Sequence, residues 1–423
     1  MKGGDENERV IGIRVKKIIR NKLTLFVCIG SLTITGILFS LAVFREIAID
    51  ENGKQYVGKE AFDLERMYDS KVAGLLTEDK VKKTIAEYQK LYSDPDNLEE
   101  TAEGTTLKES VFVKYIQPYY SYFKVIDEVY IEPSTIDMTF SALEDVDTAQ
   151  EGSYYKAREN KISTLLNQEY LDWNYSDAEK EFWINRTDKV ELPYEYGYCG
   201  GWKTFLNCSE LLLVGIIAIC ICIAPVFAGE YQSQADSVVL TTKYGKTKLV
   251  TAKILASFIF AIILFGIHIM VALGVQLLVA GADGVALPIQ LMNVICPYSL
   301  TMGSAVLMVI ITALVVMLGM VSLTLFLSAR LAKTFLTLIV NVLVIMVPMF
   351  LSISETSGIW NRVLMILPAM AVRPVYQDDF FGYFSYPIVT TFDITTIRLG
   401  VYVIVTLIFI PLAIRAFKKH EVC

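Results

Sequence analysis

Residues 211–228 read LLLVGIIAICICIAPVFA, a run without a single charged side chain. A helix rises about 1.5 Å per residue, so roughly 20 apolar residues cross the hydrocarbon core of a bilayer. In lipid every backbone N–H and C=O must bond within the protein, which leaves a helix as the structure for such a run. The stretch therefore predicts a transmembrane helix, to which we assign residues 208–229.

Similar apolar runs lie on both sides of this stretch. Together they predict six transmembrane helices, at residues 23–45, 208–229, 250–281, 298–329, 334–353 and 397–415. Residues 354–396 hold another apolar run, around Pro368, which is too short to span and favours an external or re-entrant segment. The expected fold is an all-α polytopic membrane protein.

The charged residues are concentrated between the first two predicted spans. The chain is 54% hydrophobic, yet it carries 45 acidic and 38 basic residues, and most of the acids lie in 46–207. This part is long enough to bury a core of its own. Apolar residues three or four apart predict helices in Gly58–Leu76 and Asp79–Tyr92, and Ser176 with Glu179 fits a capping box. We expect a mainly helical (α or α+β) extracellular domain.

Basic residues beside the spans indicate the orientation of the chain. With six spans, all four basic groups fall on one side of the membrane, which the positive-inside rule makes the cytoplasm. These groups are Lys16, Lys17, Arg20 and Lys22; Lys243, Lys246, Lys248 and Lys253; Arg330 and Lys333; and Arg415, Lys418 and Lys419. We therefore expect a multi-pass protein of the plasma membrane, in a bacterium, with both termini cytoplasmic.

The two ends of the chain lie outside the spans. Residues 1–22 place apolar and basic residues at helical spacing, which predicts a cytoplasmic amphipathic helix on the membrane surface. A solvated basic tail is the alternative. Residues 416–423 form a cytoplasmic tail.

Enzymatic motifs are not found in the sequence. The end of a phosphate-binding loop is matched by Gly245, Lys246 and Thr247. The motif is incomplete, because Leu240 occupies the position of its first Gly. We expect no catalytic residues, no metal site and no cofactor bound by this chain. His268 lies inside the third span and is a candidate residue of a transport path, because ionisable groups in spans often serve function. A neutral His bonded to a neighbouring helix is the alternative.

Two cysteines and three tyrosines stand just before or at the start of the second span. Cys199 and Cys208 could form a disulfide outside the cell, and free thiols are the alternative. Tyr194, Tyr196 and Tyr198 are typical of an aromatic belt at a membrane interface.

The connection between the second and third spans reads PVFAGEYQSQADSVVLTTKYGKTKLVTAKI, residues 225–254. Glu230 closes the second span, an aliphatic-rich short helix is expected around Ser233–Thr242, and a turn at Tyr244 and Gly245 leads to basic residues ending at Lys253. A short helix that lies parallel to the membrane offers a surface to which a soluble motor protein can bind.

This connection resembles that of the ABC-2 family of ABC transporter permeases. In that family a Glu at the end of the second span is followed by Gly-Thr, several Leu, a Pro, a basic residue and a Lys where the third span starts. Glu230, Val239, Leu240, Lys246 and Lys253 fall in this register. The sequence departs from the pattern at Gln234 and Ala235, which replace Gly-Thr, and at Lys243, which replaces Pro.

The resemblance implies a permease subunit of an exporter for a peptide, an antibiotic, a lipid or an ion. Its partners would be a second permease, identical or not, and two cytoplasmic ABC ATPases that bind the ATP and Mg; no nucleic acid is expected. Residues 230–249 would form the coupling-helix loop. The ATPase-coupling residues would be Glu230, Gln234, Asp236, Tyr244, Gly245, Lys246 and Lys253.

Two other functions are compatible with the same topology. The chain could be a membrane sensor or receptor whose external domain binds a peptide, although the tail after Ile414 is too short for an effector domain. It could also be a mechanotransmitting permease without its own translocation path, but such proteins have fewer spans after the external domain.

Overall fold

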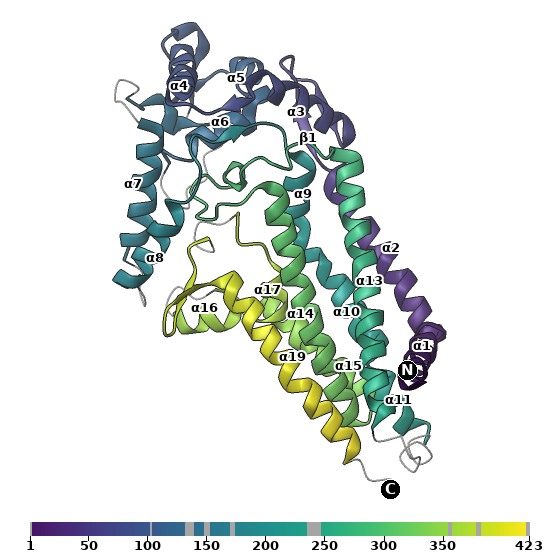
Figure 1. The fold of residues 1–423 in the computed structure, drawn as a ribbon. Coiled ribbons are helices and arrows are strands. Elements are labelled where there is room, and N and C mark those ends of the chain that lie inside the picture. The colour runs from purple at the N-terminus through teal and green to yellow at the C-terminus, as the bar shows by residue number, and fades with distance from the viewer. Residues whose placement is uncertain are drawn as a thin grey trace.

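The computed structural model describes residues 2–101, 104–131, 139–147, 153–169, 174–234, 247–353, 358–377 and 382–419. Two parts are visible in Figure 1: a sheaf of long helices and a domain at one end of it. We call the residues between α2 (Lys22–Phe44) and α9 (Gly200–Cys208) the inserted domain. The end of the sheaf away from it is the basic end, where both chain termini lie (Figure 1).

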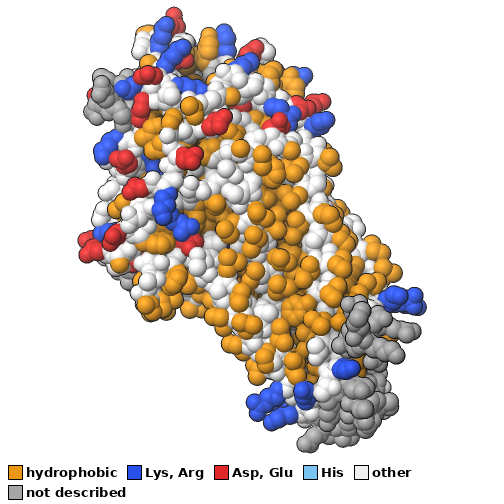
Figure 2. Space-filling view, viewed as in Figure 1, with side chains coloured by type: hydrophobic (Ala, Val, Ile, Leu, Met, Phe, Trp, Pro, Cys, Tyr) orange, Lys and Arg blue, Asp and Glu red, His pale blue; other side chains and the backbone are white. Residues whose placement is uncertain are grey.

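Five helical stretches among the described residues are long and apolar enough to cross a membrane, which fits the predicted multi-pass protein. They are Lys22–Phe44, Gly200–Gln232, Lys248–Ala280 (α13), Met302–Leu331 (α14) and Ile394–Lys418 (α19). The fifth predicted span, residues 334–353, is also helical but shorter, comprising α15 (Thr334–Met346) and the 3-10 turn Val347–Phe350 that contains Pro348. Side chains along the sheaf form a hydrophobic surface between the charged inserted domain and the basic end (Figure 2).

The second apolar stretch begins earlier than the sequence predicted and is broken in the middle. It consists of α9, the 3-10 turn Ser209–Leu212, α10 (Leu213–Ile223) and α11 (Pro225–Gln232). Pro225 separates α10 from α11 because proline has no N–H to donate. Ser328 of α14 compensates for the break: its Oγ accepts from the amides of Phe227 and Ala228, at 3.1 and 2.9 Å, and donates to the carbonyl of Ala224.

The helices of the sheaf pack closely where small residues allow it. α14 runs along α19, and α13 packs on α2 and on α1 (Lys2–Ile19). At Gly319 of α14, an added Cβ would lie 2.6 Å from the ring of Tyr402 on α19. The α14–α19 packing therefore depends on the missing side chain at this position.

The inserted domain is mainly helical, as predicted, with short two-stranded sheets. Its elements are β1 (Ile47–Ile49), β2 (Gln55–Val57), α3 (Lys59–Val72), β3 (Gly74–Leu75), α4 (Glu78–Tyr92), β4 (Leu98–Thr101), β5 (Gly104–Leu107), α5 (Glu109–Tyr115), α6 (Tyr120–Asp127), α7 (Ser153–Asn167), α8 (Asp177–Thr187) and β6 (Glu195–Tyr196). β1 pairs with β2, β3 with β6 and β4 with β5, all antiparallel. The predicted capping box of Ser176 and Glu179 is confirmed at the start of α8.

Three tyrosines near the end of the inserted domain form buried hydrogen bonds to distant parts of the chain. The prediction that Tyr194, Tyr196 and Tyr198 form a lipid-facing belt is wrong, because all three are buried. Their hydroxyls donate to polar partners within the protein: to Val294 O at 3.0 Å, to Asp69 Oδ1 at 2.7 Å and to Ala280 O at 2.5 Å, respectively. A buried tyrosine needs such a partner for its hydroxyl, and here the partners belong to distant segments.

The connection from α15 to α19 also reaches the inserted domain. It contains the short helices α16 (Gly358–Leu364) and α17 (Pro368–Val372) and the hairpin of β7 (Ser385–Pro387) and β8 (Thr391–Asp393). Ser385 donates to the carboxylate of Glu179 on α8 at 2.8 Å, and Arg362 lies 3.6 Å from the same carboxylate. Neither helix is long enough to span, as expected for this segment.

Candidate functional site: a charged cluster at the basic end

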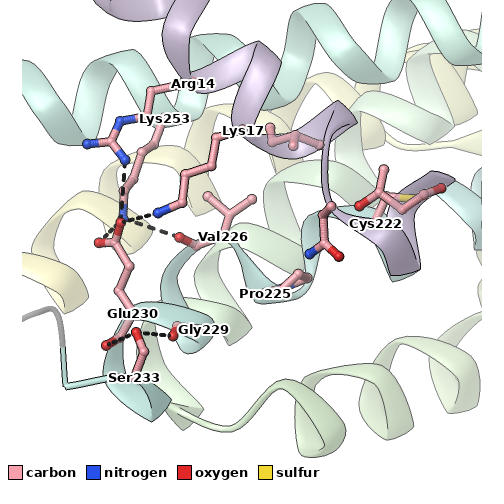
Figure 3. A pocket seen from close by; sticks show the side chains of 12 residues that line it. Arg14, Lys17, Cys222, Pro225, Val226, Gly229, Glu230, Ser233 and Lys253 are labelled. Carbon is pink, nitrogen blue, oxygen red and sulfur yellow. Dashed lines mark hydrogen bonds and ion pairs between the residues drawn. The ribbon is translucent and has the colours of Figure 1, made fainter.

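Glu230 and Lys253 form a buried ion pair between the second and third apolar helices (Figure 3). Glu230 lies near the end of α11 and Lys253 in the second turn of α13, and their side chains are 7% and 3% exposed. The ammonium group of Lys253 also donates to the carbonyl of Val226 at 3.2 Å. Two such deeply buried charges are retained only when they are paired and hydrogen-bonded.

The N-terminal helix brings two more cations to the same carboxylate. Arg14 and Lys17 of α1 each lie 3.6 Å from Glu230 Oε1, with side chains 22% and 64% exposed. Their spacing of three residues puts both on one face of α1. Three basic side chains from two helices therefore surround one acid, which leaves a surplus of positive charge. We call these four residues the charged cluster.

Aromatic rings complete the surroundings of Lys253. Its Nζ lies 4.9 Å from the ring centroid of Phe227 on α11 and 5.0 Å from that of Phe417 near the end of α19. Ring faces attract a cation, most strongly where water is excluded. The last turn of α19 is in this way connected to the start of α13 and the end of α11.

A cavity of about 260 Å³ opens beside the charged cluster (Figure 3). Its walls come from α1, the start of α2, the α10–α11 break and α13. The residues that line it are Arg14, Lys17, Ile18, Asn21, Thr24, Cys222, Pro225, Val226, Gly229, Glu230, Ser233 and Lys253. Cys222, Pro225 and Val226 bring the α10–α11 junction into this lining.

Of the residues predicted to couple to an ATPase, the structure brings Glu230 and Lys253 into contact. Gln234 is exposed two residues beyond α11, and its positive φ of 55° marks the point where the helical path ends. Asp236, Tyr244, Gly245 and Lys246 lie outside the described residues. Arg14 and Lys17 were not predicted as site residues, because the sequence does not reveal that α1 packs on α13 and brings their side chains to Glu230.

His268 joins α13 to α2 and is fully buried. Its Nδ1 is 2.8 Å from Thr35 Oγ1 and its Nε2 is 3.2 Å from Ser31 Oγ. Because both ring nitrogens have hydroxyl partners in the same chain, the arrangement favours the neutral, helix-bonded His that was the alternative at this position. Its part in a transport path stays a prediction.

Of the two states considered for Cys199 and Cys208, a disulfide or free thiols, the structure shows free thiols. Cys199 precedes α9 and Cys208 is its last residue, so the helix separates the two residues by its full length. Nine residues of helix rise about 13 Å, and a disulfide requires Cα atoms within roughly 7 Å. The free thiols follow from the helical conformation of this stretch, which a loop would not impose.

A second cavity, of about 520 Å³, lies at the opposite end of the sheaf beside the inserted domain. It is lined by residues of α8, the 298–300 segment and the start of α19, including Arg186, Lys189, Tyr298 and Asp393. Arg186 is 3.5 Å from the buried carboxylate of Asp393 and 4.4 Å from the ring centroid of Tyr298. This arrangement of charged and aromatic groups was not predicted from the sequence.

Comparison with known proteins returned no relative. No family model matches the chain, and neither a curated protein nor a solved structure is significantly similar to it.

Proposed function

We propose that the chain is the permease subunit of an ATP-driven transporter of the ABC-2 type. The observation that carries this proposal is the buried ion pair of Glu230 and Lys253. It joins the end of the second apolar helix to the start of the third, at the two ends of the connection between them. These are the two residues of the ABC-2-like register that flank the predicted coupling helix. A force applied to that connection would reach α1, α11 and α13 together through the charged cluster.

The topology in this proposal has six spans, with α15 and its following turn as the fifth. An even number of spans agrees with the position of both termini at the basic end (Figure 1). Lys and Arg side chains are visible at that end in Figure 2, as the positive-inside rule requires of a cytoplasmic face. The inserted domain is then extracellular, and the host membrane is the plasma membrane of a bacterium.

In the proposed mechanism a separate ATPase binds the 230–249 loop. ATP-driven closure of two such ATPases moves the loops of a permease dimer and switches its helices between two arrangements. The charged cluster serves as a rigid link, because a buried pair cannot be separated without leaving an uncompensated charge. The transported compound would be a peptide, an antibiotic, a lipid or an ion.

Co-purification tests the partner. The tagged chain, extracted in mild detergent from its native host, should retain a protein with a phosphate-binding loop and ATPase activity. In a triple variant, Asp236→Ala, Tyr244→Ala and Lys246→Ala, the ATPase should be lost from the complex or its hydrolysis uncoupled from transport, with membrane insertion unchanged. A chain that is isolated without any ATPase, or a triple variant that behaves as the parent, would overturn the proposal.

A membrane receptor is the second candidate function, and the cavity of about 520 Å³ favours it. Arg186, Tyr298 and Asp393 make this a site for a small polar or aromatic ligand at the extracellular end. A receptor would bind such a ligand without an ATPase, so the same co-purification separates the two functions.

A further inference from the structure

The cavity beside the charged cluster has the features of an anion site. Arg14, Lys17 and Lys253 line it together with a single carboxylate, that of Glu230. Glu230 is bound most closely by Lys253, whereas Arg14 and Lys17 approach its other oxygen at 3.6 Å, longer than a hydrogen bond. The guanidinium group of Arg14 and the ammonium group of Lys17 therefore have donors left for another acceptor.

The remaining walls of the cavity suit a molecule with an apolar part. Ile18, Val226, Pro225 and Cys222 line it beside the charged residues, and Asn21 and Ser233 contribute polar groups. The cavity lies at the basic end, where the hydrophobic surface of the sheaf gives way to Lys and Arg side chains (Figure 2). In a membrane protein this is the level of the lipid phosphates.

We propose that this cavity binds the phosphate group of an anionic phospholipid of the adjoining leaflet. The phosphate is held by Arg14, which offers two parallel N–H donors, and by Lys17, while Lys253 keeps its bond to Glu230. The acyl chains lie along the apolar surface next to α1 and α2. This inference rests on the membrane topology and not on the presence of an ATPase.

Bound lipid would have a defined consequence for the cluster. Its phosphate contacts both cations that α1 contributes and offsets one of the two surplus positive charges, so that α1 is held to the rest of the protein through a shared phosphate as well as through Glu230. The position of α1 against α11 and α13 then depends on the headgroup composition of the leaflet.

The experiment uses the full chain in mild detergent and measures its thermal unfolding and, by native mass spectrometry, the lipids that it retains. Phosphatidylglycerol is compared with phosphatidylcholine, and inorganic phosphate and glycerol phosphate are tested as anions without acyl chains. Arg14→Gln, Lys17→Gln and their combination are compared with Lys16→Gln. Lys16 is exposed on the same helix and does not line the cavity.

We expect phosphatidylglycerol to be retained and to raise the unfolding temperature of the parent chain and of Lys16→Gln. Each cavity substitution should weaken this binding about tenfold, the equivalent of one charge-assisted hydrogen bond. Glu230→Gln should retain more phosphatidylglycerol in the mass spectrum, since a repelling carboxylate is removed, although the loss of the buried pair lowers its unfolding temperature. Lys17→Gln replaces an exposed side chain, so the test does not depend on a variant that fails to fold.

Two results would overturn the inference. Equal retention of phosphatidylglycerol by the parent and by the Arg14→Gln/Lys17→Gln chain would show that the lipid binds elsewhere. Protection by inorganic phosphate as strong as that by phosphatidylglycerol would show that the occupant is a free anion. Because the readout is lipid binding, either result leaves the co-purification of an ATPase as a separate question.

Discussion

Glu230 and Lys253 lie 23 positions apart in the chain, and their side chains meet in a buried ion pair between α11 and α13. Each charge is excluded from water, so each depends on the other to offset its desolvation. The pair also fixes the geometry at the base of the connection between these two helices. Its contribution can be measured by removing the charges one at a time and together.

Single substitutions in this pair should destabilise the protein strongly. Lys253→Met and Glu230→Gln are each expected to lower the free energy of unfolding by about 3–5 kcal/mol, because one buried charge loses its partner. The double variant should be more stable than the sum of the two losses predicts. Thermal unfolding in detergent measures this, with Lys22→Gln at an exposed position as the control. Strictly additive losses would contradict the described pairing.

Gly215 should not tolerate a side chain. A Cβ added there would lie 3.0–3.3 Å from three atoms of His268. Gly215→Ala is therefore expected to cost about 1–3 kcal/mol through overpacking between α10 and α13. Gly266→Ala is the matched control, since nothing lies within 4 Å of its added Cβ and alanine favours a helix. Equal unfolding temperatures of the two variants would show that α10 does not pack on His268.

Ser328 should be essential for the break at Pro225. Ser328→Ala leaves the amides of Phe227 and Ala228 without their hydroxyl acceptor, at an expected cost of about 1–3 kcal/mol. Ser322 is equally buried on the same helix, but its hydroxyl bonds only to Leu318 O one turn earlier. Ser322→Ala should therefore be close to neutral in the same unfolding assay. A larger loss from Ser322→Ala than from Ser328→Ala would refute the role described for the hydroxyl.

The inserted domain should lose stability as the pH rises from 4.5 to 7. Burial, together with the nearby carboxylate of Glu46, raises the pKa of Glu65 from 4.5 to about 7. Between these values the folded protein keeps a proton that the unfolded chain has released, so the free energy of unfolding falls with rising pH and levels off above pH 7. Hydrogen exchange in α3 as a function of pH measures the effect.

The control for this pH dependence lies on the same helix. Glu65→Gln should flatten the profile, whereas Glu60→Gln, at an exposed position of α3, should retain it. A pH profile that survives unchanged in Glu65→Gln would assign the dependence to another group.

Much of the fold was predictable because its signals are local. The apolar runs predicted the long helices and the acidic stretch predicted a separate helical domain, since lipid and water impose opposite compositions on the chain. The capping box at Ser176 and Glu179 was found for the same reason, because its two residues are three positions apart. The N-terminal helix α1 was predicted from the helical spacing of its apolar and basic residues.

Contacts between distant segments were not predictable in this way. Tyr194, Tyr196 and Tyr198 have the composition of an interfacial belt, and only the tertiary structure supplies the buried partners that they bind. Cys199 and Cys208 are separated by a sequence length that a loop could close, and only the formation of α9 holds them apart.

For the candidate site, the order of residues along the chain already places Glu230 and Lys253 at the ends of apolar helices. The tertiary structure decided that they pair, that Arg14 and Lys17 join them from α1, and that a cavity remains beside them. The spacing of apolar residues and the length of an uncharged run depend only on residues that are close in sequence, so both can be predicted from the sequence. The environment of a buried charge depends on groups that folding brings from elsewhere, so it exists only once the helices have packed.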